Sequence, residues 1–178
     1  EREELGGSLN LANKAPGKFR MDNLIRYYRT QVEKRPNIEV RLNEKITADN
    51  LEKIENLQPY AVIDAVGGNP ILPGRIPGIE KGISCNDVLR RQVKFAHATV
   101  AVVGGGMSGL ETAEVLAADG NKVIIVEMAP IIGNGIYFYN VRKTRRILES
   151  AGCEIKTETA LQEPLWWHRT KRTLSLRQ

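Results

Sequence analysis

The chain has 178 residues, of which 42% are hydrophobic and 26% are charged, and it carries a formal net charge of +5. These values are ordinary for a globular protein, so they exclude disordered, collagen-like and coiled-coil proteins. The apolar runs are far too short to span a bilayer, and the N-terminus has neither the basic start nor the apolar stretch of a signal peptide. We therefore expect a cytoplasmic protein with no membrane partner.

Residues 1–68 have the pattern of a partial α/β unit. Apolar residues at helical spacing over 22–34 predict an amphipathic helix. Alternating apolar and charged residues over 38–42 predict a short strand, and the apolar run 60–66 predicts a second, buried strand. Between them we expect a helix that is capped by Thr47. A strand, a helix and a strand in this order indicate a parallel sheet.

Residues 69–98 are rich in Gly and Pro, which break both helices and strand ladders, so we expect a linker with one short helix over 86–91. A second α/β pattern follows over 99–160. Its predicted strands cover 99–103, 122–128 and 154–157, and its predicted helices cover 107–119, ended by Gly120, and 139–150. The fold class is therefore α/β, with Rossmann-like parallel sheets and flanking helices.

A G-x-G-x-x-G motif at Gly104, Gly106 and Gly109 is the strongest local signal. Glycine-rich turns are common, so the pattern alone is weak. Here a predicted strand enters the motif and a predicted helix leaves it. Glu127 ends the next strand about 20 residues further on, as the dinucleotide-binding fingerprint requires.

Each part of this motif has a physical role in binding a dinucleotide. Gly104 permits the tight turn, Gly106 lets the backbone approach a pyrophosphate, and Gly109 lets the helix pack closely on the strand. The N–H groups and the dipole at the helix start attract phosphate. The residues expected to contact the nucleotide are Gly104, Gly105, Gly106, Met107, Ser108, Gly109, Glu127 and Met128.

Glu127 is expected to select the cofactor. A carboxylate at the end of this strand accepts hydrogen bonds from both ribose hydroxyls and repels a 2′-phosphate. The next residues, Met128, Ala129 and Pro130, bring no Arg or Lys to offset that repulsion. NAD(H) is therefore favoured over NADP(H), while FAD stays open because its ribose offers the same hydroxyls.

No other side chain gives a comparable signal. Cys85 and Cys153 are too few for a disulfide framework or a four-ligand metal site, and they do not form C-x-x-C. We expect unreactive thiols and no metal. His97 and His168 have no neighbours that suggest a metal site or a Ser/His/Asp relay, so a surface or core role is favoured. No catalytic acid or base is predicted.

The positive charge raises the hypothesis of nucleic-acid binding, but its distribution argues against it. Most of the excess lies in residues 161–178, a basic tail in which Trp166 and Trp167 are adjacent. This tail is either a frameshifted or truncated end or a cover over exposed core. A second basic cluster contains Arg142, Lys143, Arg145 and Arg146. We expect it on the solvated side of a helix. A role in attracting the phosphates of a nucleotide is the less favoured alternative.

The order of four segments resembles a known family. These segments are LGGSLNLANKAPGK (5–18), AVGGNP (65–70), IPGIEKG (76–82) and VAVVGGGMSGLETAEVLAADGNKVIIVEMAP (100–130). They resemble the C-terminal FAD/NAD(P)-binding region of the NADH:flavin oxidoreductases related to old yellow enzyme. That group includes the 2,4-dienoyl-CoA reductases, the enoate reductases and trimethylamine dehydrogenase.

The resemblance implies a larger enzyme with an FMN-binding barrel, a 4Fe–4S cluster and paired FAD and NAD(P) domains. In that family NADH passes hydride to FAD, and electrons continue to FMN, where an enoyl double bond is reduced. Glu1, Gly6, Gly7 and the strand-then-glycine element at Gly67 fall where the family's FAD domain contacts its cofactor. The barrel, the cluster cysteines and the FAD fingerprint are not in the sequence. We therefore expect a fragment with two incomplete dinucleotide-binding subdomains and no turnover of its own.

Two functions follow from this resemblance. The first is the NADH-binding portion of a flavin-dependent oxidoreductase that reduces an enoyl-type substrate. The second is a non-catalytic ADP-binding module, as in the amine dehydrogenases of the same family. Flavin absorbance of the full-length parent separates them. From residue 161 onward the sequence departs from the family pattern, and Val66 and Asp64 depart from it locally.

Overall fold

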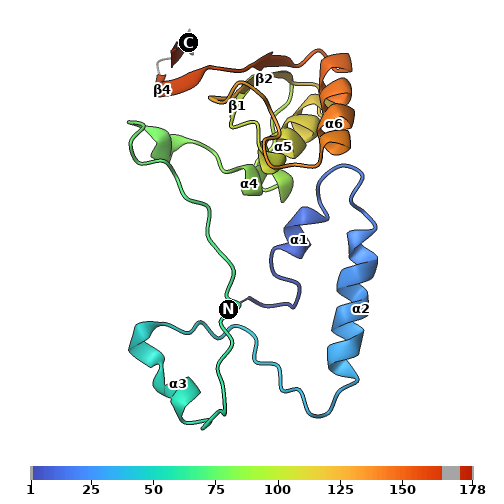
Figure 1. Cartoon of the computed structure of the whole chain (residues 1–178), viewed down its shortest axis with the longest axis vertical. Helices are drawn as coiled ribbons and strands as arrows, with labels where there is room; N and C mark the ends of the chain where they lie inside the picture. The colour runs from blue at the N-terminus through green and yellow to red at the C-terminus, as the bar shows by residue number, and fades with distance from the viewer. Residues whose placement is uncertain (1, 166–172, 178) are drawn as a thin grey trace. The chain divides into compact units, whose positions relative to one another are not determined.

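The computed structural model describes residues 2–165 and 173–177 of the chain (Figure 1). Its backbone contacts divide these residues into two compact units. The first unit contains the chain up to Asn13 together with Gly17–Pro70, and the second contains Lys14–Pro16 and the chain from Ile71 onward. Each unit is described by itself.

The first unit is helical where it is regular. Its long helix, α2, extends over Met21–Glu33 and confirms the predicted amphipathic helix. Ile25 on α2 is the one buried hydrophobic side chain in the described part of this unit, while Tyr27 and Tyr28 on the same helix are exposed. The shorter elements are α1 (Leu9–Ala12), the 3-10 helix η1 (Ala48–Asn50) and α3 (Glu52–Glu55).

The two strands predicted in the first unit are wrong. Residues 38–42 and 60–66 are extended but belong to no ladder among the described residues. Alternation of apolar side chains favours a strand, but a strand also needs a neighbour for its N–H and C=O groups. Ile63 is 88% exposed. The Asp64 carboxylate, which lies within the second of these segments, accepts the Val66 N–H (3.2 Å) in a local turn.

The helix predicted after Thr47 forms only in part. It is divided between η1 and α3, which are separated by a single turn residue, Leu51. The expected cap is present at its start, where the Thr47 N–H donates to Asn50 Oδ1 (2.7 Å). The prediction that a helix begins after Thr47 is therefore confirmed, but a cap does not determine how far the helix extends.

The second unit confirms the predicted order of strands and helices. A short helix, α4, precedes the sheet, and the Ser84 side chain accepts the Asn86 N–H at its start (3.1 Å). The elements of the unit are η2 (Ile79–Lys81), α4 (Cys85–Leu89), β1 (Thr99–Val103), α5 (Met107–Ala118), β2 (Lys122–Val126), α6 (Phe138–Ser150) and β3 (Glu154–Lys156).

The three strands form a parallel sheet in the order β1-β2-β3, with Ala101 opposite Ile124 and Ile125 opposite Ile155. Each strand is joined to the next through a helix, and right-handed crossovers place both helices on one face. In Figure 1, α5 and α6 lie side by side against this sheet. The core is formed by Leu110, Ala113, Val115, Leu116, Val123, Ile125, Val126 and Leu148, all no more than 3% exposed.

Asn121 fastens the start of β1 to the turn between α5 and β2. Its Nδ2 donates to the carbonyls of Phe95 and Leu116 (2.9 Å each), and its Oδ1 accepts the Ala98 N–H (3.1 Å). The side chain is buried, and all of its contacts satisfy backbone groups. This residue was not singled out from the sequence.

A two-stranded antiparallel ladder follows the parallel sheet. It pairs β4 (Ala160–Leu165) with β5 (Thr173–Arg177), with an irregularity between Leu161 and Glu163. The ladder was not predicted, although the sequence Thr-Leu-Ser-Leu-Arg of β5 alternates as a strand does. Trp166, Trp167 and His168 lie outside the described residues.

Candidate functional site: a dinucleotide-binding loop

The Gly-rich loop (residues 104–109) connects β1 directly to α5. Gly104 has φ +105°, a left-handed conformation that L-amino acids other than glycine rarely adopt. Its N–H donates to the carbonyl of Val126 at the end of β2 (2.8 Å). The turn therefore lies at the carboxyl edge of the parallel sheet, where ligands of open α/β sheets bind.

The other two glycines of the motif have opposite surroundings. A Cβ at Gly109 would overlap the Gly104 carbonyl oxygen, so only glycine lets α5 pack this closely on the turn. A Cβ at Gly106 would meet no atom within 4 Å. The open side of the loop is thus at Gly106, where α5 begins and where helix N–H groups and dipole favour an anion. Both observations fit the predicted roles.

Glu127 lies beside this loop, and each oxygen of its carboxylate accepts a hydrogen bond from a backbone N–H. Its Oε2 accepts the Gly105 N–H (2.6 Å), and its Oε1 accepts the Ala129 N–H (2.7 Å). A carboxylate has about four lone-pair sites, so these two bonds leave acceptor capacity for ribose hydroxyls. The backbone is fixed as well, because the Glu127 N–H donates to Lys156 and its carbonyl accepts from Thr159.

The post-β2 loop (residues 129–136) folds against the Gly-rich loop. The Gly133 N–H donates to the Gly105 carbonyl (2.7 Å), and Ile132 is only 5% exposed. A Cβ built at Gly105 would lie 2.8 Å from Ile132 Cγ2. Sequence reasoning assigned no role to Ile132 or Gly133; the one available signal was the glycine itself, which has φ +71°.

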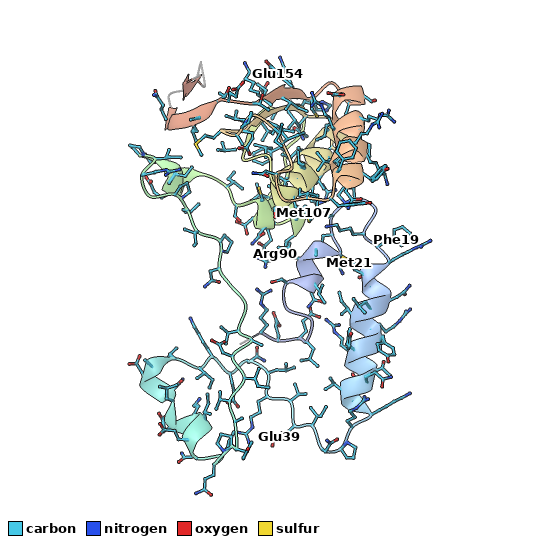
Figure 2. All side chains as sticks on the ribbon, in the orientation of Figure 1. Phe19, Met21, Glu39, Arg90, Met107 and Glu154 are labelled. Atoms are coloured by element: carbon cyan, nitrogen blue, oxygen red, sulfur yellow. The ribbon has the colours of Figure 1, made fainter. Side chains whose placement is uncertain are left out.

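The remaining predicted contact residues lie at the same edge of the sheet. Met107, at the start of α5, is 47% exposed (Figure 2), Ser108 is exposed, and Met128 is 62% exposed. Their side chains are therefore accessible to a ligand. The structure brings the eight predicted nucleotide-contacting residues together in one unit.

The described residues that the resemblance assigned to FAD all lie in the first unit. Gly6 and Gly7 lie in the turn before α1, with φ +121° and +50°. Gly67 has φ +77° in an extended segment without strand partners. Glu1 lies outside the described residues.

Cysteine, histidine and basic side chains outside the Gly-rich loop complete the description of the candidate residues. No group of three His, Cys, Asp or Glu side chains in this part of the chain could hold a metal ion. Burial raises the pKa of the Cys153 thiol, which favours its protonated form. His97 is exposed, and so are Arg142, Lys143, Arg145 and Arg146 on α6, which confirms the solvated reading of that cluster.

The surroundings of the Gly-rich loop fit a dinucleotide, and comparison with known proteins agrees. Residues 8–164 match the family described as pyridine nucleotide-disulphide oxidoreductase. The chain belongs to the pyridine nucleotide-disulphide oxidoreductase family. The domain of this family is Rossmann-like and implies binding of FAD and NAD(P)H.

Among the relatives, the chain is 41% identical over 136 residues to an NADH oxidase of Thermoanaerobacter brockii, covering 72% of this chain and 20% of that protein. It is 35% identical over 128 residues to a bilirubin reductase of Mediterraneibacter gnavus, covering 70% and 19%. The chain thus spans about a fifth of the length of these curated relatives. The structure of a 2-naphthoyl-CoA reductase complex superposes with TM-score 0.77 at 28% identity, covering 91% of this chain and 24% of that one.

In the described part of the chain, no helix is both long and apolar enough to cross a bilayer.

Proposed function

We propose that this chain is the NADH-binding portion of a longer flavin-dependent oxidoreductase. The observation that carries the proposal is the Glu127 carboxylate, which is fixed at the end of β2 next to the open Gly-rich loop. The remaining residues of the proposed site are Gly104, Gly105, Gly106, Met107, Ser108, Gly109 and Met128.

NADH, when bound, supplies a hydride for transfer to a flavin. The chain's own residues bind and orient it. The start of α5 favours the pyrophosphate by its N–H groups and dipole, and Glu127 accepts hydrogen bonds from the adenosine ribose. The same carboxylate repels a 2′-phosphate, so NADH is preferred over NADPH. None of these roles needs a protein acid or base.

The whole protein's reaction is proposed from the resemblance and from the names of the relatives. We propose that FAD, FMN and a 4Fe–4S cluster, bound largely outside these 178 residues, carry electrons to an enoyl-type substrate. A 2-naphthoyl-CoA reductase among the similar structures supports an unsaturated acyl thioester. The NADH oxidase relative supports NADH as the donor. The proposed domains are 1–68 for FAD, 69–98 as linker, 99–160 for NAD(H) and 161–178 as a tail, in a cytoplasmic protein.

Calorimetric titration of the 178-residue chain with NADH, NADPH and ADP tests this proposal. We expect NADH to bind more tightly than NADPH, and Glu127→Ala to weaken NADH binding about tenfold, because hydrogen bonds to a charged group are lost. Glu80→Ala, an exposed carboxylate in η2, is the matched control and should change nothing. The proposed contacts all fall on the ADP part of NADH, so ADP should compete with NADH, and flavin absorbance of the full-length parent separates the redox function from the non-catalytic nucleotide module. Unchanged affinity in Glu127→Ala would contradict the site.

A further inference from the structure

The Glu127 carboxylate is positioned by residues other than the three glycines that define the G-x-G-x-x-G motif. Glu127 Oε2 accepts the N–H of Gly105, the residue between the first two glycines of the motif (2.6 Å). The carbonyl of the same Gly105 accepts the N–H of Gly133 (2.7 Å). Gly105 therefore connects the carboxylate to the post-β2 loop through both of its backbone polar groups.

Packing reinforces these hydrogen bonds. Ile132 is 5% exposed, and its Cγ2 lies 2.8 Å from the place where a Cβ at residue 105 would stand. The same Cβ would be 3.1 Å from Glu127 Oε2 and 3.2 Å from Glu127 Cβ. A methyl group at residue 105 would therefore press most closely on Ile132 and, less closely, on the side chain of Glu127.

The post-β2 loop is itself fixed at this place. A Cβ at Gly133 would lie 2.5 Å from Val141 Cγ2 on α6, and Gly133 has φ +71°. Any larger residue there would be strained and would push the loop away from α6. The close approach of Gly133 to Val141 and its hydrogen bond to Gly105 together place Ile132 beside Gly105.

We propose that Ile132, Gly133 and Gly105 form a clamp that determines the preference for NADH over NADPH by holding Glu127 in the orientation that faces the ribose. This inference rests on the proposed NADH site and adds specificity-determining residues to it. Ile132 and Gly133 act through Glu127 as positioning residues. If the clamp loosens, the carboxylate turns away, so NADH loses a hydrogen-bond acceptor and NADPH loses a source of repulsion.

The clamp predicts an unusual relation between single and double variants. Gly105→Ala adds a methyl group that presses on Ile132 and Glu127 and so displaces the carboxylate. The preference for NADH should weaken, so that the dissociation constant for NADPH divided by that for NADH falls about tenfold. Ile132→Ala removes the packing over Gly105 and should lower the same ratio. In the double variant the new methyl group occupies the space that Ile132 leaves. Its ratio should therefore be closer to that of the wild type than the ratio of either single variant.

Two further variants separate positioning from general destabilisation. Ile132→Val keeps the branched methyl and should keep the wild-type ratio. Gly74→Ala, a glycine-to-alanine change with open space and no left-handed φ, should do the same. A second measurement needs no cofactor: amide hydrogen exchange at Gly105, followed by NMR, should be about tenfold faster in Ile132→Ala and unchanged in Ile132→Val. This measurement also carries the test if Gly105→Ala does not fold.

The outcomes distinguish the clamp from the site. Suppose that the wild-type chain prefers NADH to NADPH. If the effects of Gly105→Ala and Ile132→Ala then simply add, and amide exchange at Gly105 is the same in both Ile132 variants, the clamp is overturned and the site stands. If the wild-type chain does not bind NADH, the proposed function is overturned and the role of the clamp in cofactor choice falls with it.

Discussion

The two units differ in their cores: the described part of the first unit buries a single hydrophobic side chain, Ile25, whereas the second unit buries a set of them between its sheet and two helices. Tyr60 and Ile63 in the first unit are among the most exposed residues of the chain, while Ile125 and Leu148 in the second are completely buried. Figure 2 shows this contrast as side chains that crowd between β1, β2, α5 and α6 and spread apart along the extended segments of the first unit.

The difference shows that apolar patterns become core only where each strand finds a partner. In the second unit β1, β2 and β3 are consecutive in the chain and adjacent in the sheet, so each crossover helix brings the next strand into register. In the first unit the segments 38–42 and 60–66 have suitable side chains but no ladder among the described residues. The formation of the proposed NADH site therefore depends on the second unit alone.

The largest effect should come from truncating a core side chain of the second unit. Leu148→Ala removes a completely buried side chain from α6 and should lower the free energy of unfolding by about 2–5 kcal/mol. Ile63→Ala in the first unit should change it by no more than about 0.5 kcal/mol, because this side chain is already in solvent. Urea unfolding followed by circular dichroism measures both. Equal effects would mean that the two units do not differ in packing.

The next largest effect should come from Gly109→Ala. The added methyl group overlaps the Gly104 carbonyl, so α5 must move away from the turn at a cost of about 1–3 kcal/mol in the free energy of unfolding. NADH binding should fall as well, because the start of α5 moves with the helix. Gly74→Ala is the control, since its methyl group meets no atom. Unaltered stability of the Gly109 variant would contradict the close packing of helix and turn.

A smaller effect is expected from Asn121→Ala. This change leaves the carbonyl of Phe95 and the N–H of Ala98 without their side-chain partner, and should destabilise the second unit by about 1–2 kcal/mol. Asn56→Ala in the exposed end of α3 is the matched control in the first unit. Thermal unfolding compares them, and an Asn121 variant as stable as the Asn56 variant would show that this side chain does not fasten β1.

The smallest effect concerns the pH dependence of stability. Burial raises the pKa of Glu114 on α5, a hydrogen bond with Thr144 opposes this rise, and repulsion by Glu111 adds to it. A carboxyl whose pKa is higher in the folded state than in the unfolded state stabilises the fold when protonated. This contribution is lost as pH rises from about 4.5 through the folded pKa.

Glu114→Gln tests this sign. The variant should lose less stability than the wild type between acidic and neutral pH, because the buried charge can no longer form. Unfolding curves at several pH values provide the measurement. A steeper loss of stability with pH in the variant would contradict the assigned direction.

The site could be predicted from the sequence because its signals are local. Gly104 is needed for the turn after β1, and Gly109 is needed because α5 packs closely on that turn. Glu127 is found in the sequence because it lies directly after a predicted strand. The clamp could not be predicted, because Ile132 and Gly105 meet only after the post-β2 loop has folded back. The strands of the first unit failed for the related reason that side-chain alternation carries no information about a pairing partner.

NMR mapping of NADH binding tests the central claim most directly. On titration with NADH, the amide signals of residues 104–109 and of Glu127 should shift together and saturate, while signals of residues 38–42 and 60–66 stay unchanged. NADPH at the same concentrations should produce a weaker response. Shifts confined to the first unit, or saturating shifts of the same residues at equal concentrations of both nucleotides, would contradict a NADH site built from the Gly-rich loop and Glu127.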